Sequence, residues 1–586
     1  MSGGGPVQQP HVLREYSLLA DGERGAVLGP RGDIVWMCAP RWHDGSVFSA
    51  LIGGQGSFSL TPQCTYIWGG SYDEASMIWR SRWVTTEGIV ESREALAYPG
   101  DEHRAVLLRR VHAKDRAARV EFRLEPRGDY DRKPLTDLHR DGDVWTGRVG
   151  SLYLRVLGAG AARPKSDGTR LEFVLALEAG QQHDFVLEIS DEVLPDEPPV
   201  PDLEWQGTES AWRSAVPPLT QTLNPRDSRR SYAVLAGLTS KTGGMVAAAT
   251  TSLPERAEAG RNYDYRYAWI RDQCYAGHAV ASTGGGALLD AAVTFVAARI
   301  IENGHQLAPA YAVTGEPVPD QSHLGLPGYP GGGDQIGNQV NKQFQLDAFG
   351  EALQLFAVAD DLGQFPAELW PAVHGAADAI ADRWQEPDAG IWEIEPRAWT
   401  HSRLTAAAGL RAIATRSGAG HRQVEWLALA DRIVADTSAH ALHPDGHWQR
   451  AVDDPGLDAA LLLPALREAV PINDPRSKAT FAAYLEQLTE DEYAYRFRHD
   501  DRPLSEAEGS FLLCGFLVAL THDRMGNRVL ARSWYDTTRA AVGPPQLFSE
   551  EYDAIQHQMR GNLPQAFVHA LHLETAAELY HDDTTA

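Results

Sequence analysis

The chain has 586 residues, 43% of them hydrophobic and 9% aromatic, and carries a formal net charge of −26 at pH 7. This length and apolar content suit two or more domains with a large core and exclude an intrinsically disordered chain. The negative charge argues against binding to nucleic acid or to an anionic membrane surface, so we expect neither partner.

The cysteines and the start of the chain exclude further classes. The first six residues, MSGGGP, lack the basic end and apolar run of a secretion signal, and no apolar run reaches membrane-spanning length. We therefore expect a cytoplasmic protein. The cysteines are widely spaced and form no CxxC pair, so neither a disulfide scaffold nor a zinc site is predicted: Cys38, Cys64, Cys274 and Cys514.

Residues from about 16 to 203 have the pattern of β-structure. Apolar and charged side chains alternate in residues 120–124, as in a half-buried strand. Because no helical pattern intervenes between such stretches, an antiparallel sandwich is favoured over βαβ units. Prolines at 195–201 then indicate a linker. We assign residues 1–205 to an N-terminal β-sandwich domain and 206–230 to the linker. Further strands are expected at 152–156, 171–177 and 185–189.

Beyond residue 230 the apolar period changes from two to about 3.6, which indicates helices. About twelve helices suit six helical hairpins closed into an (α/α)6 barrel over residues 231–586. A helical solenoid is the alternative, but no fixed-period repeat supports it. The helices are expected near 228–240, 271–284, 285–301, 345–362, 366–384, 402–416, 422–442, 456–470, 474–488, 508–524, 527–541 and 562–580.

Residues 261–272, RNYDYRYAWIRD, combine four aromatic rings, three arginines and two aspartates. Aromatic rings offer apolar faces, and Arg and Asp offer directed hydrogen bonds. A sugar has apolar faces and a rim of hydroxyl groups, so this stretch predicts a sugar site. A buried ion-pair network at the start of a helix is the alternative interpretation.

Two acidic stretches supply candidate catalytic groups. Glu393 follows Trp392 in the segment GIWEIEP, and Glu550 lies in FSEEYD near the C-terminus. Taken singly, Glu393 suits a capping carboxylate and Glu550 a solvated acid. Two carboxylates together with an aromatic sugar platform are the components of a glycosidase.

A Gly- and Pro-rich loop is expected between residues 304 and 341. Its glycines do not follow a strand and open a helix, so they do not predict a phosphate-binding loop. Loops of this length inside a compact domain often cover an active site. We expect this loop to close the mouth of the barrel.

These motifs resemble those of glycoside hydrolase family 15, which contains glucoamylases and trehalases. Residues 261–272 resemble the family signature R-N-W-D-Y-R-Y-x-W-x-R-D, with Tyr263 in place of the usual tryptophan. Residues 390–393 resemble its general-acid segment and 549–553 its general-base segment. Residues 33–41 and 561–567 also match, so the resemblance spans nearly the whole chain.

The resemblance implies a β-sandwich followed by an (α/α)6 barrel and an inverting, exo-acting hydrolysis of α-glucosides. It implies that Glu393 is the general acid and Glu550 the general base, and no cofactor or metal is required. Dependence on phosphate or a divalent metal stays open. The expected partner is a small carbohydrate such as trehalose or a malto- or isomalto-oligosaccharide, and a homo-oligomer is not excluded. The expected substrate-binding residues are Tyr265, Trp269, Arg271, Asp272, Trp392 and Arg496.

The chain departs from the family pattern after the general acid. Ala407 stands where tryptophan is usual and Arg411 where an acid is usual, so we expect a change on the aglycone side of the pocket. Histidines at 440, 443 and 447 lie on either side of a Pro- and Gly-containing turn, which indicates a solvated turn and no metal site.

Two other classes of function stay open at this point. A phosphorylase on a similar barrel would use phosphate in place of water and would need no carboxylate base, against which Glu550 counts. A sugar-binding protein without catalysis is disfavoured because both candidate carboxylates are present.

Overall fold

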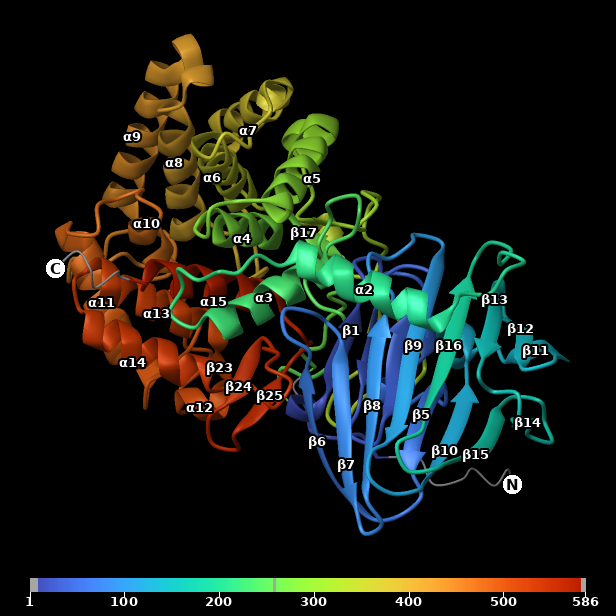
Figure 1. The fold of residues 1–586 in the computed structure, drawn as a ribbon. Helices are drawn as coiled ribbons and strands as arrows, with labels where there is room; N and C mark the ends of the chain where they lie inside the picture. The colour runs from blue at the N-terminus through green and yellow to red at the C-terminus, as the bar shows by residue number, and fades with distance from the viewer. Residues whose placement is uncertain (1–8, 257–259, 581–586) are drawn as a thin grey trace.

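The computed structural model describes residues 9–256 and 260–580. Figure 1 shows a β-sandwich on one side and a helical domain on the other, as expected from the change in apolar period. The first six residues, on which the expectation of a cytoplasmic protein rests, lie outside the described residues. No helix in the described residues is both long and apolar enough to cross a membrane.

The N-terminal domain is an antiparallel sandwich of two eight-stranded sheets, as predicted. The first runs in the order β1-β2-β3-β5-β10-β15-β14 with β4 beside β3, and the second in the order β11-β12-β13-β16-β9-β8-β7-β6. The first comprises β1 (Ser17–Ala20), β2 (Gly25–Leu28), β3 (Asp33–Cys38), β4 (Ser46–Phe48), β5 (Ser57–Pro62), β10 (Ala118–Glu125), β14 (Arg163–Pro164) and β15 (Leu171–Leu177). The second comprises β6 (Tyr66–Tyr72), β7 (Trp79–Thr85), β8 (Ile89–Leu96), β9 (Arg104–Ala113), β11 (Leu135–Asp141), β12 (Val144–Val149), β13 (Leu152–Leu157) and β16 (Gln182–Ser190).

The sandwich core follows the alternation seen in the sequence. In β10, Val120, Phe122 and Leu124 are buried while the charged residues between them are not. Arg109 and Glu94 form a fully buried ion pair in this core at 2.8 Å. Arg109 also donates to the carbonyl oxygen of Phe58 in the opposite sheet, so the pair ties the two sheets together.

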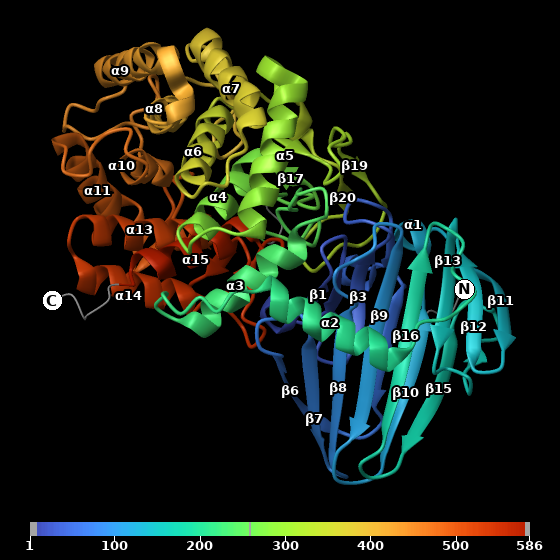
Figure 2. The same ribbon diagram turned by 45° about the horizontal axis from the view of Figure 1, so that its top comes forward.

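The helical domain is a closed ring of helix pairs. Inner helices α4, α6, α8, α10, α13 and α15 contact one another in this order, and α15 returns to α4. Outer helices cover them, as Figure 2 shows for α5 outside α4 and α9 outside α8. The inner helices are α4 (Ile270–Ala281), α6 (Asp347–Asp361), α8 (Thr400–Ala414), α10 (Leu463–Leu466), α13 (Leu512–Arg524) and α15 (Ala566–Glu578); the outer ones are α3 (Pro225–Leu238), α5 (Ala287–Asn303), α7 (Trp370–Arg383), α9 (Gln423–His440), α11 (Pro475–Gln487) and α14 (Arg528–Arg539).

Two segments differ from the sequence expectation. The helix expected near 456–470 is a 3-10 turn, Ala459–Leu462, followed by the four-residue α10. The segment 206–230, expected as a linker, contains most of α2 (Pro201–Ala215) and the start of α3. The α2 helix packs on β9 and β16, where Trp212 stacks on Tyr98 with ring centroids 3.9 Å apart. Its buried tryptophans explain why these residues form a packed helix.

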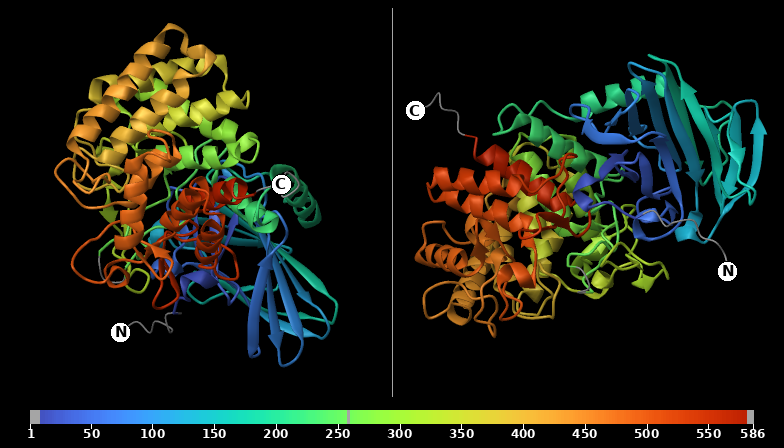
Figure 3. Two further views of the ribbon diagram at one scale, coloured as in Figure 1. Left: turned by 90° about the vertical axis from the view of Figure 1, so that its left-hand side faces the viewer. Right: turned by 90° about the horizontal axis from the view of Figure 1, so that it is seen from below.

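The two domains share a junction that both views in Figure 3 show. Trp36 in β3 donates its indole N–H to the carbonyl oxygen of Ala249 at 2.9 Å. Gly22 donates its backbone N–H to the carbonyl oxygen of Gly237, at the end of α3. The sandwich is therefore bonded to segments that lead directly into the barrel.

Candidate active site

A cavity opens at the N-terminal ends of α4, α13 and α15. The N-terminal end of a helix carries a partial positive charge, which suits the hydroxyl oxygens of a sugar. All eight residues predicted from the sequence line this cavity. Its lining residues are Ala247, Tyr265, Trp269, Arg271, Asp272, Tyr275, Ile391, Trp392, Glu393, Arg496, Phe511, Leu513, Glu550, Gln565 and Phe567.

The stretch 261–272 supplies one wall of the cavity because its side chains point in different directions. Tyr265 and Trp269 line the cavity in edge-to-face contact, with ring centroids 5.6 Å apart. The side chain of Arg266 is 1% exposed and points away, binding Asp264 through two hydrogen bonds of 2.8 and 2.7 Å. Part of this stretch therefore faces the cavity and part forms a buried ion pair, while sugar binding stays a prediction.

Arg266 also anchors the cavity wall to the sandwich. Its guanidinium donates to the carbonyl oxygens of Trp42 at 3.3 Å and Asp44 at 3.1 Å, and to the sulfur of Cys38 at 3.2 Å. Its partner Asp264 accepts the backbone N–H of Gly337 at 3.0 Å. The N-terminal domain thus holds the signature stretch from behind.

Glu393 lies in a tight turn between α7 and α8. Gly390 adopts φ +67°, and a side chain there would meet the ring of Trp399 at 2.8 Å, so this position requires glycine. Asp388 holds the turn by accepting the N–H of Gly390 and the hydroxyl of Ser402, each at 2.8 Å. Glu393 itself has φ +58°, a conformation that non-glycine residues adopt at an energetic cost.

Three donors hold Glu393 by one oxygen. Trp269 donates its indole N–H to Oε1 at 2.6 Å, Gln345 donates at 3.3 Å and Arg271 at 3.4 Å. None of the hydrogen bonds among the described residues uses Oε2. That oxygen is thus available for a proton directed into the cavity.

Glu550 is placed by a short antiparallel sheet. It precedes β24 (Glu551–Asp553), which pairs with β23 (Ser510–Phe511) and β25 (Gln558–Arg560). Successive side chains point to opposite faces of a strand, so Glu550 lines the cavity and Glu551 does not. Tyr265 donates its hydroxyl to the Glu550 carboxylate, with oxygens 3.2 and 3.4 Å away.

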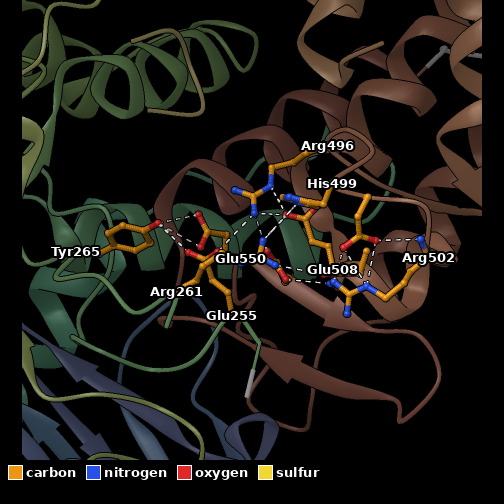
Figure 4. Close-up of polar contacts among 12 residues, drawn as sticks. Glu255, Arg261, Tyr265, Arg496, His499, Arg502, Glu508 and Glu550 are labelled. Atoms are coloured by element: carbon orange, nitrogen blue, oxygen red, sulfur yellow. Dashed lines mark hydrogen bonds and ion pairs between the residues drawn. The ribbon is translucent and has the colours of Figure 1, made fainter. Parts of the chain in front are cut away.

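Arg496 lines the cavity and is surrounded by carboxylates, among them Glu255 and Glu508 in Figure 4. Its Nε donates to Glu508 at 2.6 Å, and its Nη2 lies 3.1 Å from Glu551 and 3.5 Å from Glu255. The guanidinium also lies over the ring of Phe511, 4.4 Å from its centroid. These contacts fix the orientation of Arg496 toward the cavity.

Arg271 and Asp272 begin α4, and Asp272 has an unused acceptor. The Asp272 side chain is 2% exposed, and its Oδ1 has no hydrogen-bond partner among the described residues. Burial raises the pKa of Asp272 to about 7, although Arg271, 3.7 Å away, opposes this shift. A buried oxygen without a partner is costly, so a ligand hydroxyl at this place would be held strongly.

Several residues of the site were not predicted from the sequence. Gln345 and Glu255 contact the two candidate carboxylates, yet neither lies in a stretch with a distinctive pattern. Gln565 does lie in a stretch that resembles the family, residues 561–567, although that stretch was not interpreted as part of the cavity. The other additional cavity residues are Ala247, Tyr275, Ile391, Phe511, Leu513 and Phe567.

Ala407 and Arg411, where the chain departs from the family pattern, both lie away from the cavity. Ala407 is fully buried within α8 and does not line the cavity. Arg411 lies toward the C-terminal end of α8, where it bonds Asp431 at 2.7 Å and the carbonyl oxygen of Ala469. Because the inner helices begin at the cavity, their C-terminal ends lie at the opposite end of the barrel.

The loop 304–341 also differs from its expected role. None of its described residues lines the cavity. Instead, Gly328 bonds Ile52 and Tyr329 bonds His11, so the loop contacts the sandwich domain. It contains the short strands β18 (Ala310–Tyr311), β19 (Ser322–His323) and β20 (Gln335–Ile336).

The three histidines near residue 443 lie at the end of α9 and in the following turn, and they do not line the cavity. The rings of His443 and His447 stack with centroids 4.3 Å apart. Together with Asp445, these two histidines offer ligand atoms within 4.8 Å of one another. His440 instead contacts the carbonyl oxygen of Asp436 within α9.

Two further acids are buried in the barrel below the cavity. The four carboxyl oxygens of Asp347 and Glu351 on α6 have no hydrogen-bond partner among the described residues. Burial raises the pKa of Asp347 to about 6 and that of Glu351 to about 8. The positive charges of Arg467 and Arg271 lower the pKa of Glu351, and the negative charges of Asp347 and Glu574 raise it, but burial has the largest effect.

Glu351 should make the protein less stable as pH rises. Its carboxyl ionises near pH 4.5 in the unfolded chain and near 8 in the folded one, so its stabilising effect is lost between these values. Between these pH values, the free energy of unfolding should therefore fall less steeply with pH in Glu351→Gln than in the parent, by up to about 1.4 kcal/mol per pH unit. Urea-unfolding midpoints at several pH values between 5 and 8 would measure this change. Equal slopes for Glu351→Gln and for Glu302→Gln, an exposed control, would contradict the prediction.

Comparisons with known proteins agree with this architecture. The model of glycosyl hydrolases family 15 matches residues 230–577, and that of the trehalase-like N-terminal domain matches residues 7–158. The chain is 31% identical to a trehalase of Mycobacterium tuberculosis, over 97% of this chain and 90% of that protein. It is 26% identical to trehalase 1 of Sulfolobus acidocaldarius, over 95% of this chain and 97% of that protein.

A solved structure shares both domains. A bacterial glucoamylase complexed with acarbose superposes with a TM-score of 0.72 at 12% identity, over 99% of this chain and 96% of that chain. This match shows the fold alone, a sandwich joined to an (α/α)6 barrel. With that fold and these relatives, the protein is a glycoside hydrolase. The chain belongs to glycosyl hydrolases family 15.

Proposed function

We propose that the protein is an inverting, exo-acting hydrolase that releases β-glucose from a small α-glucoside, with trehalose as the first candidate. One observation carries this proposal. Glu393 and Glu550 line the same cavity, and each accepts a hydrogen bond from one of two aromatic rings in edge contact, Trp269 and Tyr265. Two carboxylates held on either side of a ring pair are arranged to act on one glycosidic bond.

In the proposed mechanism, Glu393 donates its proton to the glycosidic oxygen as the bond to C1 breaks. A water molecule attacks C1 from the opposite face and gives its proton to Glu550. Room for that water requires the two carboxyl groups to be about 6.5–9.5 Å apart. Glu393 ends ionised and Glu550 protonated, and exchange with solvent restores both.

The remaining cavity residues would bind the non-reducing glucose. Asp272 and Arg271 offer an acceptor and donors for its hydroxyls, while Tyr265, Trp269 and Trp392 offer apolar walls. Arg496 would contact a hydroxyl of the sugar, in the bound substrate or in the transition state. Trp392 is fixed for this role because its indole N–H donates to Asp458 at 2.7 Å.

The choice of trehalose rests on the sequence relatives, since the two reported above match nearly the full chain and are named trehalases. No described residue of the 304–341 loop extends the cavity.

The function is tested by comparing kcat/KM for trehalose, maltose, isomaltose and soluble starch. We expect a disaccharide to be preferred and trehalose to be cleaved to equal initial amounts of α- and β-glucose, because only the attacked C1 inverts. Proton NMR during the first turnovers resolves the two anomers. Two α-anomers from trehalose, or preference for starch, would contradict the proposal.

The same assay separates the two alternative functions. A phosphorylase would form a sugar phosphate and would need added phosphate, so reactions in phosphate-free buffer and in phosphate are run side by side. A sugar-binding protein without catalysis would bind a disaccharide and release no glucose. Release of free glucose without any sugar phosphate, in the phosphate buffer as well, is the expected result.

A further inference from the structure

The immediate neighbour of Glu550 is a second buried carboxyl group, Glu255. Both residues are 4% exposed. The hydroxyl of Tyr265 bridges them, lying 3.4 Å from Oε1 of Glu255 and 3.2 Å from Oε1 of Glu550. Figure 4 shows Glu255 and Glu550 beside each other at the Tyr265 hydroxyl. Glu255 does not line the cavity, so it acts on Glu550 from behind.

Backbone packing holds the pair in place. Gly561 donates its N–H to the carbonyl oxygen of Pro254 at 2.7 Å. A Cβ atom on Gly561 would lie 3.3 Å from the Cβ of Glu550 and 3.5 Å from its Oε2. The segments that carry Glu255 and Glu550 are thus pressed together, with glycine leaving room for both carboxyl groups.

The charges around the pair do not balance if every acid is ionised. Four buried carboxyls, Glu255, Glu508, Glu550 and Glu551, face two guanidiniums, so full ionisation leaves an excess of two negative charges before His499 is counted. An unpaired charge at this depth is costly, and such a site retains a proton instead. Glu508 has its pKa lowered to about 2 by Arg496 and His499, which oppose its burial, so it stays ionised.

Glu255 and Glu550 are placed to hold such a proton between them. Burial raises the pKa of both groups, and the neighbouring Glu255 carboxyl raises that of Glu550 further. Glu551 is differently placed, because its Oε2 accepts the N–H of Gly509 at 3.1 Å and its Oε1 faces Arg496. The ionisable groups that face the pair are Arg261, Tyr263, Tyr265, Arg496, Glu508 and Glu551.

We propose that Glu255 is a positioning residue that shares one proton with Glu550, donating it to one oxygen while the other oxygen receives the proton of the attacking water. This inference rests on the proposed role of Glu550 as general base. In the form that reacts, the proton lies on Glu255 and Glu550 is ionised. As the water attacks, its proton passes to Glu550, the pair then holds two protons, and one returns to solvent after product release.

Two substitutions at Glu255 test the proposal. Glu255→Gln keeps an N–H donor for Glu550 and carries no charge, so it imitates the protonated form. We expect kcat within about threefold of the parent, and an acid limb of the kcat/KM–pH profile within about 0.3 pH unit, because Glu550 keeps its neutral donor. Glu255→Leu removes the donor. It should lower kcat at least tenfold and move the acid limb upward by about one pH unit, because a buried carboxylate without a donor is harder to ionise.

Glu508→Gln is the matched control. It removes a carboxylate from the same arginine but has no contact with Tyr265 among the described residues. It should therefore change KM through Arg496 without reproducing the difference between the Gln and Leu variants at position 255. If Glu255→Leu fails to fold, the Gln variant can still overturn the proposal through a downward shift of its acid limb.

Three results would overturn the proposal. A downward shift of the acid limb by a pH unit or more in Glu255→Gln would show that Glu255 is ionised in the parent. A Gln variant as damaged as the Leu variant would show that its charge is required, and two variants like the parent would show that Glu255 is a spectator. The Glu550→Gln variant tests the proposed function separately. If Glu550 is the general base, this variant is inactive whatever the variants at position 255 show.

Discussion

Glu550→Gln should lower kcat at least about a thousandfold without unfolding the protein. The amide keeps the size of the side chain and can still bond Tyr265, but it cannot accept the proton of the attacking water. The loss should therefore be in kcat, with little change in KM. Steady-state kinetics with trehalose would measure it, and circular dichroism would check the fold.

The neighbouring acid provides the control for this variant. Glu551 is fully buried, faces Arg496 at 3.1 Å and does not line the cavity. Glu551→Gln should affect activity less than Glu550→Gln does. The opposite order, with Glu550→Gln nearly as active as the parent, would make Glu551 the better candidate for the base.

Glu393 and Glu550 can be told apart by the leaving group. Glu393→Gln should lose a similar factor on trehalose, because an alcohol leaving group needs a proton. With α-glucosyl fluoride, whose leaving group needs little protonation, Glu393→Gln should retain most of its activity while Glu550→Gln stays inactive. Equal losses for both variants on both substrates would refute the division of roles.

Asp272→Ala should lower kcat/KM by about 3 kcal/mol, or roughly 150-fold. The buried Oδ1 of Asp272 has no partner among the described residues, so a sugar hydroxyl bonded there would contribute strongly. The loss in kcat/KM should be seen with every disaccharide that is hydrolysed, because each would place a glucose beside Asp272.

Deoxyglucosyl analogues distinguish binding from support. If Asp272 bonds a particular hydroxyl, the analogue lacking that hydroxyl should be a poor substrate for the parent and should lose little more in Asp272→Ala. An unchanged kcat/KM in Asp272→Ala would mean that Asp272 only balances the charge of Arg271. The contact between Asp272 and Arg271 at 3.7 Å would then explain why Asp272 is buried.

The fold could be predicted in detail because it depends on local patterns. The alternation in residues 120–124 became β10, and the helical period after residue 230 became the helix pairs of the barrel. Errors arose where packing outweighed pattern. Residues 206–215 look like a linker after a run of prolines, but Trp205 and Trp212 bury themselves against the sandwich and hold them in α2.

The sequence by itself determined the family, the order of the domains and which side chains could serve a sugar. All three can be read from residue types at short spacings. In residues 261–272, for example, the alternation of aromatic and charged residues is visible within a few positions of the chain. Glu393 and Glu550 could be named because each lies in a distinctive short segment.

The tertiary structure alone decided which groups meet. Glu255 and Glu550 are far apart in the chain, and no local pattern marks Glu255, yet Tyr265 and Gly561 bring the two carboxyls together. The same is true of Arg411, whose position along α8 places it at the far end of the barrel from the cavity. Contacts of this kind depend on how whole helices and loops pack, and so does the burial that keeps a proton between two acids.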